Sequence, residues 1–155
     1  MNAKPYLENI AQQFADMQLD AVMIGNAAAA INGAPVTTLD VDFMLKQTDE
    51  NYRKLAALAQ QMNCSFIEMK LLDDNYMYRL MHREETLIMD FLFTAAGITS
   101  FETLKANSTT VFFGTHALRI AALEDILASK RAAARPKDNA TIPILEMTLD
   151  EQRKQ

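Results

Sequence analysis

Apolar residues recur along this chain at two spacings, and together the spacings predict a mixed domain of helices and strands. Helical spacing predicts helices over residues 4–18, 27–31, 49–62 and 122–135, and a final helix to about residue 154 after a break at 135–138. Apolar runs predict strands over 21–24, 39–45, 65–70, 76–82 and 86–93, and shorter ones over 110–113 and 117–120. This order is typical of an α/β (α+β) domain, a small mixed sheet flanked by helices.

Length, charge and cysteine content narrow the class of protein. A chain of 155 residues suits one domain spanning residues 1–155, and 50% hydrophobic residues can fill its core. The net charge of −5 gives no strong nucleic-acid signal. A lone Cys64 argues against a disulfide or a zinc–thiolate cluster. Without a membrane-length apolar run or a signal-peptide pattern, we expect a cytoplasmic protein with no membrane contact.

The most informative pattern is a pair of acidic residues inside the apolar strand predicted over 39–45. Asp40 and Asp42 are two positions apart, so their side chains point to the same side of a strand. Two neighbouring carboxylates repel each other and are costly to remove from water. A divalent cation relieves that repulsion, and oxygen-only ligands suit Mg²⁺, with Mn²⁺ as the alternative.

A third carboxylate interrupts the strand predicted over 86–93. Taken alone, Asp90 can equally be a capped or salt-bridged core residue. Beside Asp40 and Asp42 it would complete a three-carboxylate site, which we expect in a cleft at one edge of the sheet. Such a site can hold two Mg²⁺ ions about 3.5–4 Å apart, as in phosphoryl or nucleotidyl transfer.

A glycine-containing turn precedes the acidic pair. Gly25 and Asn26 lie between a predicted strand and a predicted helix. Backbone N–H groups at such a junction can bind phosphate. The signal is weak alone, because many strand–turn–helix units contain glycine.

Together these residues resemble the nucleotidyltransferase superfamily of polymerase-β-like enzymes. The resemblance rests on Gly25-Asn26-Ala27, Gly33, the segment from Thr38 to Asp42, and Asp90 on a later strand. The segment 123–138 is similar to small bacterial and archaeal nucleotidyltransferase-like proteins, including the catalytic domain of abortive-infection and toxin–antitoxin nucleotidyltransferases. The resemblance spans roughly residues 20–145.

The resemblance implies a metal-dependent transfer of a nucleoside monophosphate from an NTP, such as ATP, to a hydroxyl group. The acceptor stays open between a protein, a tRNA end and a small molecule, and a protein partner or a second copy of the chain can complete the site. The implied catalytic and metal-binding residues are Asp40, Asp42 and Asp90, and the implied nucleotide-binding residues are Gly25, Asn26, Thr38, Lys130 and Asp138. For Lys130 a solvated surface lysine is the alternative, and for Asp138 a helix cap.

Two departures from the family pattern motivate a second hypothesis. Asn26 stands where the family has a second glycine or a serine, and Val36 where it often has an arginine. A catalytically inactive nucleotidyltransferase-fold module that binds a partner protein would tolerate both changes. A third reading is a structural domain with coincidental aspartates.

Overall fold

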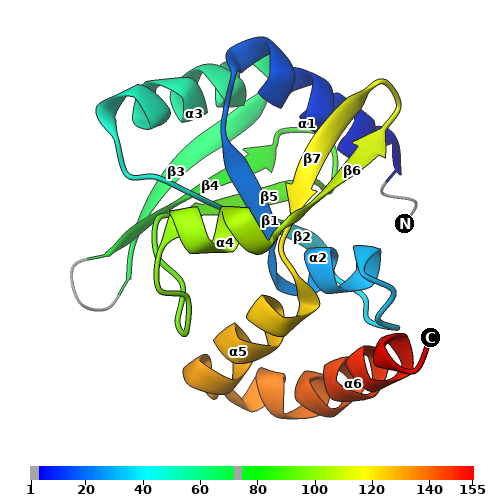
Figure 1. The fold of residues 1–155 in the computed structure, drawn as a ribbon. Helices are drawn as coiled ribbons and strands as arrows, with labels where there is room; N and C mark the ends of the chain where they lie inside the picture. Colours follow the sequence, from blue (N-terminus) through cyan, green and yellow to red (C-terminus); the bar gives the residue numbers. More distant parts are fainter. Residues whose placement is uncertain (1–3, 72–74) are drawn as a thin grey trace.

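A seven-stranded mixed sheet forms the centre of the protein in the computed structural model, which describes residues 4–71 and 75–155 (Figure 1). Across the sheet the strands are β3 (Cys64–Lys70), β4 (Tyr76–His82), β5 (Ile88–Leu92), β2 (Asp40–Leu45), β1 (Ala21–Ile24), β7 (His116–Ile120) and β6 (Thr109–Phe113). The mixed α/β architecture and the small mixed sheet predicted from the sequence are confirmed.

Both parallel and antiparallel pairings occur in the sheet. Strands β3, β4 and β5 follow one another as an antiparallel meander, and β6 and β7 form a hairpin. Strand β2 runs parallel to β5 and antiparallel to β1, which in turn runs parallel to β7. The two acidic strands, β2 and β5, are therefore neighbours in the interior of the sheet.

Six helices in residues 4–71 and 75–155 pack around the sheet. They are α1 (Lys4–Met17), α2 (Gly25–Ile31), α3 (Asp49–Gln61), α4 (Phe101–Asn107), α5 (Leu123–Ala133) and α6 (Pro136–Arg153). Helices α5 and α6 pack against each other, and α5 also contacts α2 (Figure 1). No helix in the described ranges is both long and apolar enough to cross a membrane.

Three phenylalanines tie α1 to the centre of the sheet. The ring of Phe14 in α1 meets Phe43 of β2 edge-on, with ring centroids 4.9 Å apart. Phe43 stacks on Phe91 of β5 at 5.3 Å. Because neighbouring side chains alternate between the faces of a strand, this packing leaves Asp42 and Asp90 on the opposite face.

The predicted elements agree with the structure to within about two residues at most ends, as expected for helix and strand boundaries. Helix α5 ends at Ala133 because Ala134 adopts a left-handed conformation, φ 49°, and Pro136 then starts α6. Helix α4 has no predicted counterpart. Ser100 caps it by accepting a hydrogen bond from the Thr103 amide, and Phe101 and Leu104 bury its inner face.

Candidate active site

One row of directly paired residues carries charge across the middle of the sheet. Asp42 of β2 lies opposite Asp90 of β5, and Asp90 lies opposite Arg79 of β4. Ile24 and Ile67 continue the row on either side. Directly paired residues project to the same face of a sheet, so the two carboxylates and the guanidinium are neighbours on one face.

Asp40 lies two positions before Asp42 and projects to the same face. Its side chain is 39% exposed, and its Oδ2 lies 3.9 Å from the Arg79 guanidinium. The hydroxyl of Thr38 accepts a hydrogen bond from the Asp40 amide and fixes the backbone at the start of β2. The three aspartates thus converge from adjacent strands as expected. The expected position was wrong, since β2 and β5 are interior strands and not the edge of the sheet.

Asp42 is a carboxylate whose charged form is disfavoured by its surroundings. Burial and, after it, the charges of Asp90 and Asp40 raise its pKa to about 6 against the opposing charges of Lys137 and Lys130. The ionised form is therefore held at a free-energy cost, and a bound cation would lower that cost.

Gly25 lets α2 begin close to this carboxylate. Its φ of +73° is in the left-handed region, and a Cβ added there would lie 2.8 Å from Asp42 Oδ2. A side chain at position 25 would therefore be strained and would displace the Asp42 carboxylate.

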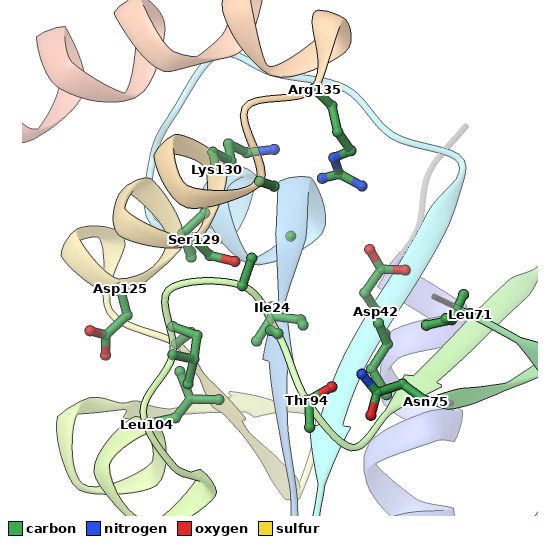
Figure 2. Close-up of a pocket in the computed structure, with 18 residues that line it drawn as sticks. Ile24, Asp42, Leu71, Asn75, Thr94, Leu104, Asp125, Ser129, Lys130 and Arg135 are labelled. Atoms are coloured by element: carbon green, nitrogen blue, oxygen red, sulfur yellow. The ribbon is translucent and has the colours of Figure 1, made fainter. Parts of the chain in front are cut away.

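A cavity of about 460 Å³ opens on one side of Asp42, between the sheet and helix α5. Figure 2 shows the Asp42 carboxylate pointing from β2 toward the wall where Lys130 and Arg135 lie. The remaining polar lining includes Ser129 and Thr94. Most of the rest of the wall is apolar and consists of Ile24, Leu71, Leu92, Ala95, Ala96, Ile98, Leu104, Ala121, Ile126 and Ala133.

Asp138 organises the cationic wall. It is 1% exposed, lies 3.6 Å from the Lys130 ammonium, and accepts hydrogen bonds from the Arg135 backbone and side chain. Burial alone would raise the pKa of Asp138, but hydrogen bonds from Arg135 and the charge of Lys130 lower it overall. Lys130 is itself 7% exposed, and its burial lowers its pKa while Asp138 opposes the shift.

The predicted nucleotide-binding residues divide into two groups. Gly25 and Lys130 line the cavity, and Lys130 is a buried residue, not the solvated lysine that was the alternative. Thr38, Asn26 and Asp138 are not among the lining residues. Asp138 acts in the capping box of α6, and the nucleotide-binding role of all three stays a prediction. The Asn26 Oδ1 atom is buried and has no hydrogen-bond partner among the described residues.

Two functional candidates were missed from the sequence, Arg79 and Arg135. Arg79 is the only charge in the apolar strand β4, the same signal that marks Asp90 in β5. Arg135 directly precedes Pro136, so it looks like part of a helix break.

The carboxylates fit a divalent cation unequally. Asp40 and Asp42 offer oxygen atoms on one face, and burial together with the charges of Asp90 and Asp40 raises the pKa of Asp42. Both oxygens of Asp90 instead accept hydrogen bonds from Arg79, at 2.8 and 2.9 Å. Within residues 4–71 and 75–155, no group of three histidine, cysteine or acidic residues is arranged to hold a metal ion. Asp40 and Asp42 are therefore the carboxylates with oxygens available to a cation, and the three-carboxylate metal site stays a prediction.

Known structures show which fold this is. The lincosamide antibiotic adenylyltransferase LnuA, solved with lincomycin bound, gives a TM-score of 0.64 at 12% identity, covering 94% of this chain and 96% of that one. The antibiotic-resistance factor ANT(2'')-Ia gives 0.63 at 13% identity, with 94% and 83% covered. An antigenic nucleotidyltransferase-like protein from Paracoccidioides brasiliensis gives 0.59 at 16% identity, with 95% and 75% covered. The chain has a nucleotidyltransferase fold. No protein-family model and no curated protein matches this nucleotidyltransferase-fold chain.

We predict that Gly25→Ala destabilises the protein more than Gly114→Ala. Both glycines have a positive φ, +73° and +69°, so the backbone penalty of about 1 kcal/mol is shared. At position 25 the new Cβ would lie only 2.8 Å from Asp42 Oδ2, which adds about 1–2 kcal/mol of overpacking, whereas at position 114 its nearest atoms belong to Glu8 at 3.7 Å, an ordinary contact. Urea denaturation measures the difference. The excess should disappear in an Asp42→Ala background, and an equal loss in the two single variants would contradict the contact.

We also predict a pH-dependent effect of Asp42→Asn on the metal-free protein. The folded state holds a proton on Asp42 more tightly than the unfolded state, so wild type loses stability as pH rises from about 4 through about 6. Screening by solvent limits the loss to about 1–2 kcal/mol. Thermal melts in EDTA should therefore show Asp42→Asn gaining on wild type between pH 4.5 and 7.5. Parallel stability profiles over that range would refute the electrostatic stress.

Proposed function

We propose that this protein is a divalent-cation-dependent nucleotidyltransferase that moves a nucleoside monophosphate from an NTP to a hydroxyl acceptor. One observation carries the proposal: in a nucleotidyltransferase fold, a stressed carboxylate, Asp42, faces two cationic side chains, Lys130 and Arg135, across a cavity. A cation–triphosphate complex carries a positive charge that can bind Asp42 and negative charges that can bind Lys130 and Arg135.

The two walls of the cavity would bind the two parts of that complex. Asp42, on the sheet side of the cavity, would hold the cation together with Asp40, which is not among the lining residues, and Lys130 and Arg135 would bind phosphate oxygens. Arg135 forms directional paired hydrogen bonds with anions and Lys130 acts as a point charge. The apolar wall at Leu92, Leu104 and Ile126 is suited to the flat base.

The reaction is an in-line displacement. The acceptor oxygen forms a bond to the α-phosphorus, the bond to the bridging oxygen breaks, pyrophosphate leaves with the electron pair, and the hydroxyl proton is lost. When bound, the cation supplies charge neutralisation and lowers the pKa of the attacking hydroxyl. Lys130 and Arg135 stabilise the charge that develops on the phosphates, while the apolar wall excludes water. Asp90 is a poor proton acceptor because Arg79 engages both of its oxygens.

A small-molecule hydroxyl is the first acceptor class to test. LnuA is a lincosamide antibiotic adenylyltransferase, and ANT(2'')-Ia is an antibiotic-resistance factor. These names support ATP as the first donor to test. A protein or a tRNA end stays the alternative acceptor.

Two observations favour the non-catalytic alternative. The Arg79–Asp90 pair neutralises one carboxylate without any metal, and Val36 packs against the core where the family often has an arginine. In a partner-binding module these residues would serve only to stabilise the fold. A measurement of nucleotide binding distinguishes the enzyme from the partner-binding module.

We predict that the protein binds a non-hydrolysable ATP analogue in the presence of Mg²⁺ and releases pyrophosphate from an NTP when an acceptor is supplied. Isothermal titration calorimetry measures the binding, and a coupled pyrophosphate assay measures turnover with a panel of antibiotics that includes lincosamides, with tRNA and with cell extract. Asp42→Asn should lower turnover by at least about 100-fold, and Lys130→Met by about 10- to 100-fold, as expected for groups that stabilise transition-state charge.

Matched controls come from an exposed ion pair outside the cavity. Asp20→Asn and Lys105→Met alter the same side-chain types in a pair that has side-chain exposures of 49% and 36%, and both variants should keep wild-type turnover. Circular dichroism must show that every variant is folded. If a folded wild-type protein binds no NTP at millimolar concentration, the partner-binding module is the better account.

A further inference from the structure

Arg79 occupies the space between two of the three carboxylates. Its Nη2 atom lies 2.9 Å from Asp90 Oδ2 and 3.9 Å from Asp40 Oδ2, while its Nε atom donates to Asp90 Oδ1 at 2.8 Å. The guanidinium therefore bridges the carboxylates that would have to share a second divalent cation with Asp42.

The pairing of strands β4 and β5 fixes the contact between Arg79 and Asp90. Arg79 and Asp90 are direct partners in the antiparallel pairing of β4 and β5, so the backbone register brings them together. The Asp90 side chain is 8% exposed and the Arg79 side chain 29%, so the paired groups are largely shielded from water. A bidentate arginine–carboxylate pair in such surroundings is strong and geometrically specific.

We propose that Arg79 serves as a fixed internal cation in place of one of two divalent ions, so that the site binds a single ion at Asp40 and Asp42. This inference rests on the proposed function in one respect, namely that the single bound ion is a cofactor of the reaction. In this arrangement Asp90 is a positioning residue that anchors Arg79 and is not a metal ligand. The sequence-based expectation of Asp90 as the third ligand is thereby replaced.

The alternative is that Asp90 releases Arg79 and binds metal. That change would free a guanidinium that now donates two hydrogen bonds to Asp90 and lies near Asp40. It would also require Asp90, whose side chain is 8% exposed, to exchange one cation for another. Breaking a buried pair is costly because it leaves an uncompensated charge.

The test counts Mn²⁺ ions. Electron paramagnetic resonance of free Mn²⁺, at millimolar metal and without nucleotide, gives the number bound per chain and their affinity. Wild type should bind one ion. Arg79→Met should bind two, because Asp40 and Asp90 are then free to share the second, and Arg79→Lys, which keeps the charge, should bind one.

A charge-neutral double variant keeps the test informative if Arg79→Met does not fold. Arg79→Met/Asp90→Leu replaces the ion pair with apolar side chains of similar reach, which buried pairs often tolerate. It should still bind one Mn²⁺ with affinity within about threefold of wild type, whereas Asp42→Asn, which loses a ligand, should weaken binding at least about tenfold.

Two ions in wild type, or a loss in the double variant as large as that of Asp42→Asn, would overturn the internal-cation inference while leaving the proposed function standing. No bound Mn²⁺ in wild type would also overturn it. The proposed function would fail as well only if the ATP analogue also failed to bind.

Discussion

The need to neutralise three carboxylates on one face of two neighbouring strands shapes the whole site. Asp40, Asp42 and Asp90 come together because β2 and β5 pair in parallel register. Arg79, fixed by the register of β4, satisfies Asp90. Asp42 is left half-buried beside two other carboxylates, with its pKa raised to about 6. The fold thus creates a localised deficit of positive charge at one carboxylate, and that deficit is the basis for expecting a cation there.

The C-terminal helices supply the opposite half of the charge pattern. Ala134 turns the chain between α5 and α6. After the turn, Asp138 forms an ion pair with Lys130 and accepts a hydrogen bond from Arg135. The cap of α6 and the side of the cavity that carries Lys130 and Arg135 therefore depend on the same carboxylate. This explains why Asp138 is almost fully buried although it does not line the cavity. Loss of its carboxylate would disturb the start of α6 and the position of both cations together.

The sequence predicted what depends on local pattern and missed what depends on register. The acidic strands, the hairpin and the long helices follow from the spacing of apolar residues. Strand phase showed that Asp40 and Asp42 share a face, but the pairing of Asp90 with Asp42 and of Arg79 with Asp90 depends on strand register, which no local pattern encodes. The salt-bridged reading of Asp90 was open from the sequence, and the structure supplies its partner. The short helix α4 was missed because only two buried residues, Phe101 and Leu104, mark it.

In the proposed complex a single divalent cation at Asp40 and Asp42 joins the carboxylates to a nucleotide bound by Lys130 and Arg135. A crystal structure with Mn²⁺ and a non-hydrolysable ATP analogue, with Mn²⁺ located by anomalous scattering, tests it most directly. We expect one anomalous peak at the Asp40–Asp42 pair, with the nucleotide phosphates in contact with Lys130 and Arg135. Arg79 should still be bound to Asp90. A nucleotide bound elsewhere, or no peak at the aspartate pair, would contradict it.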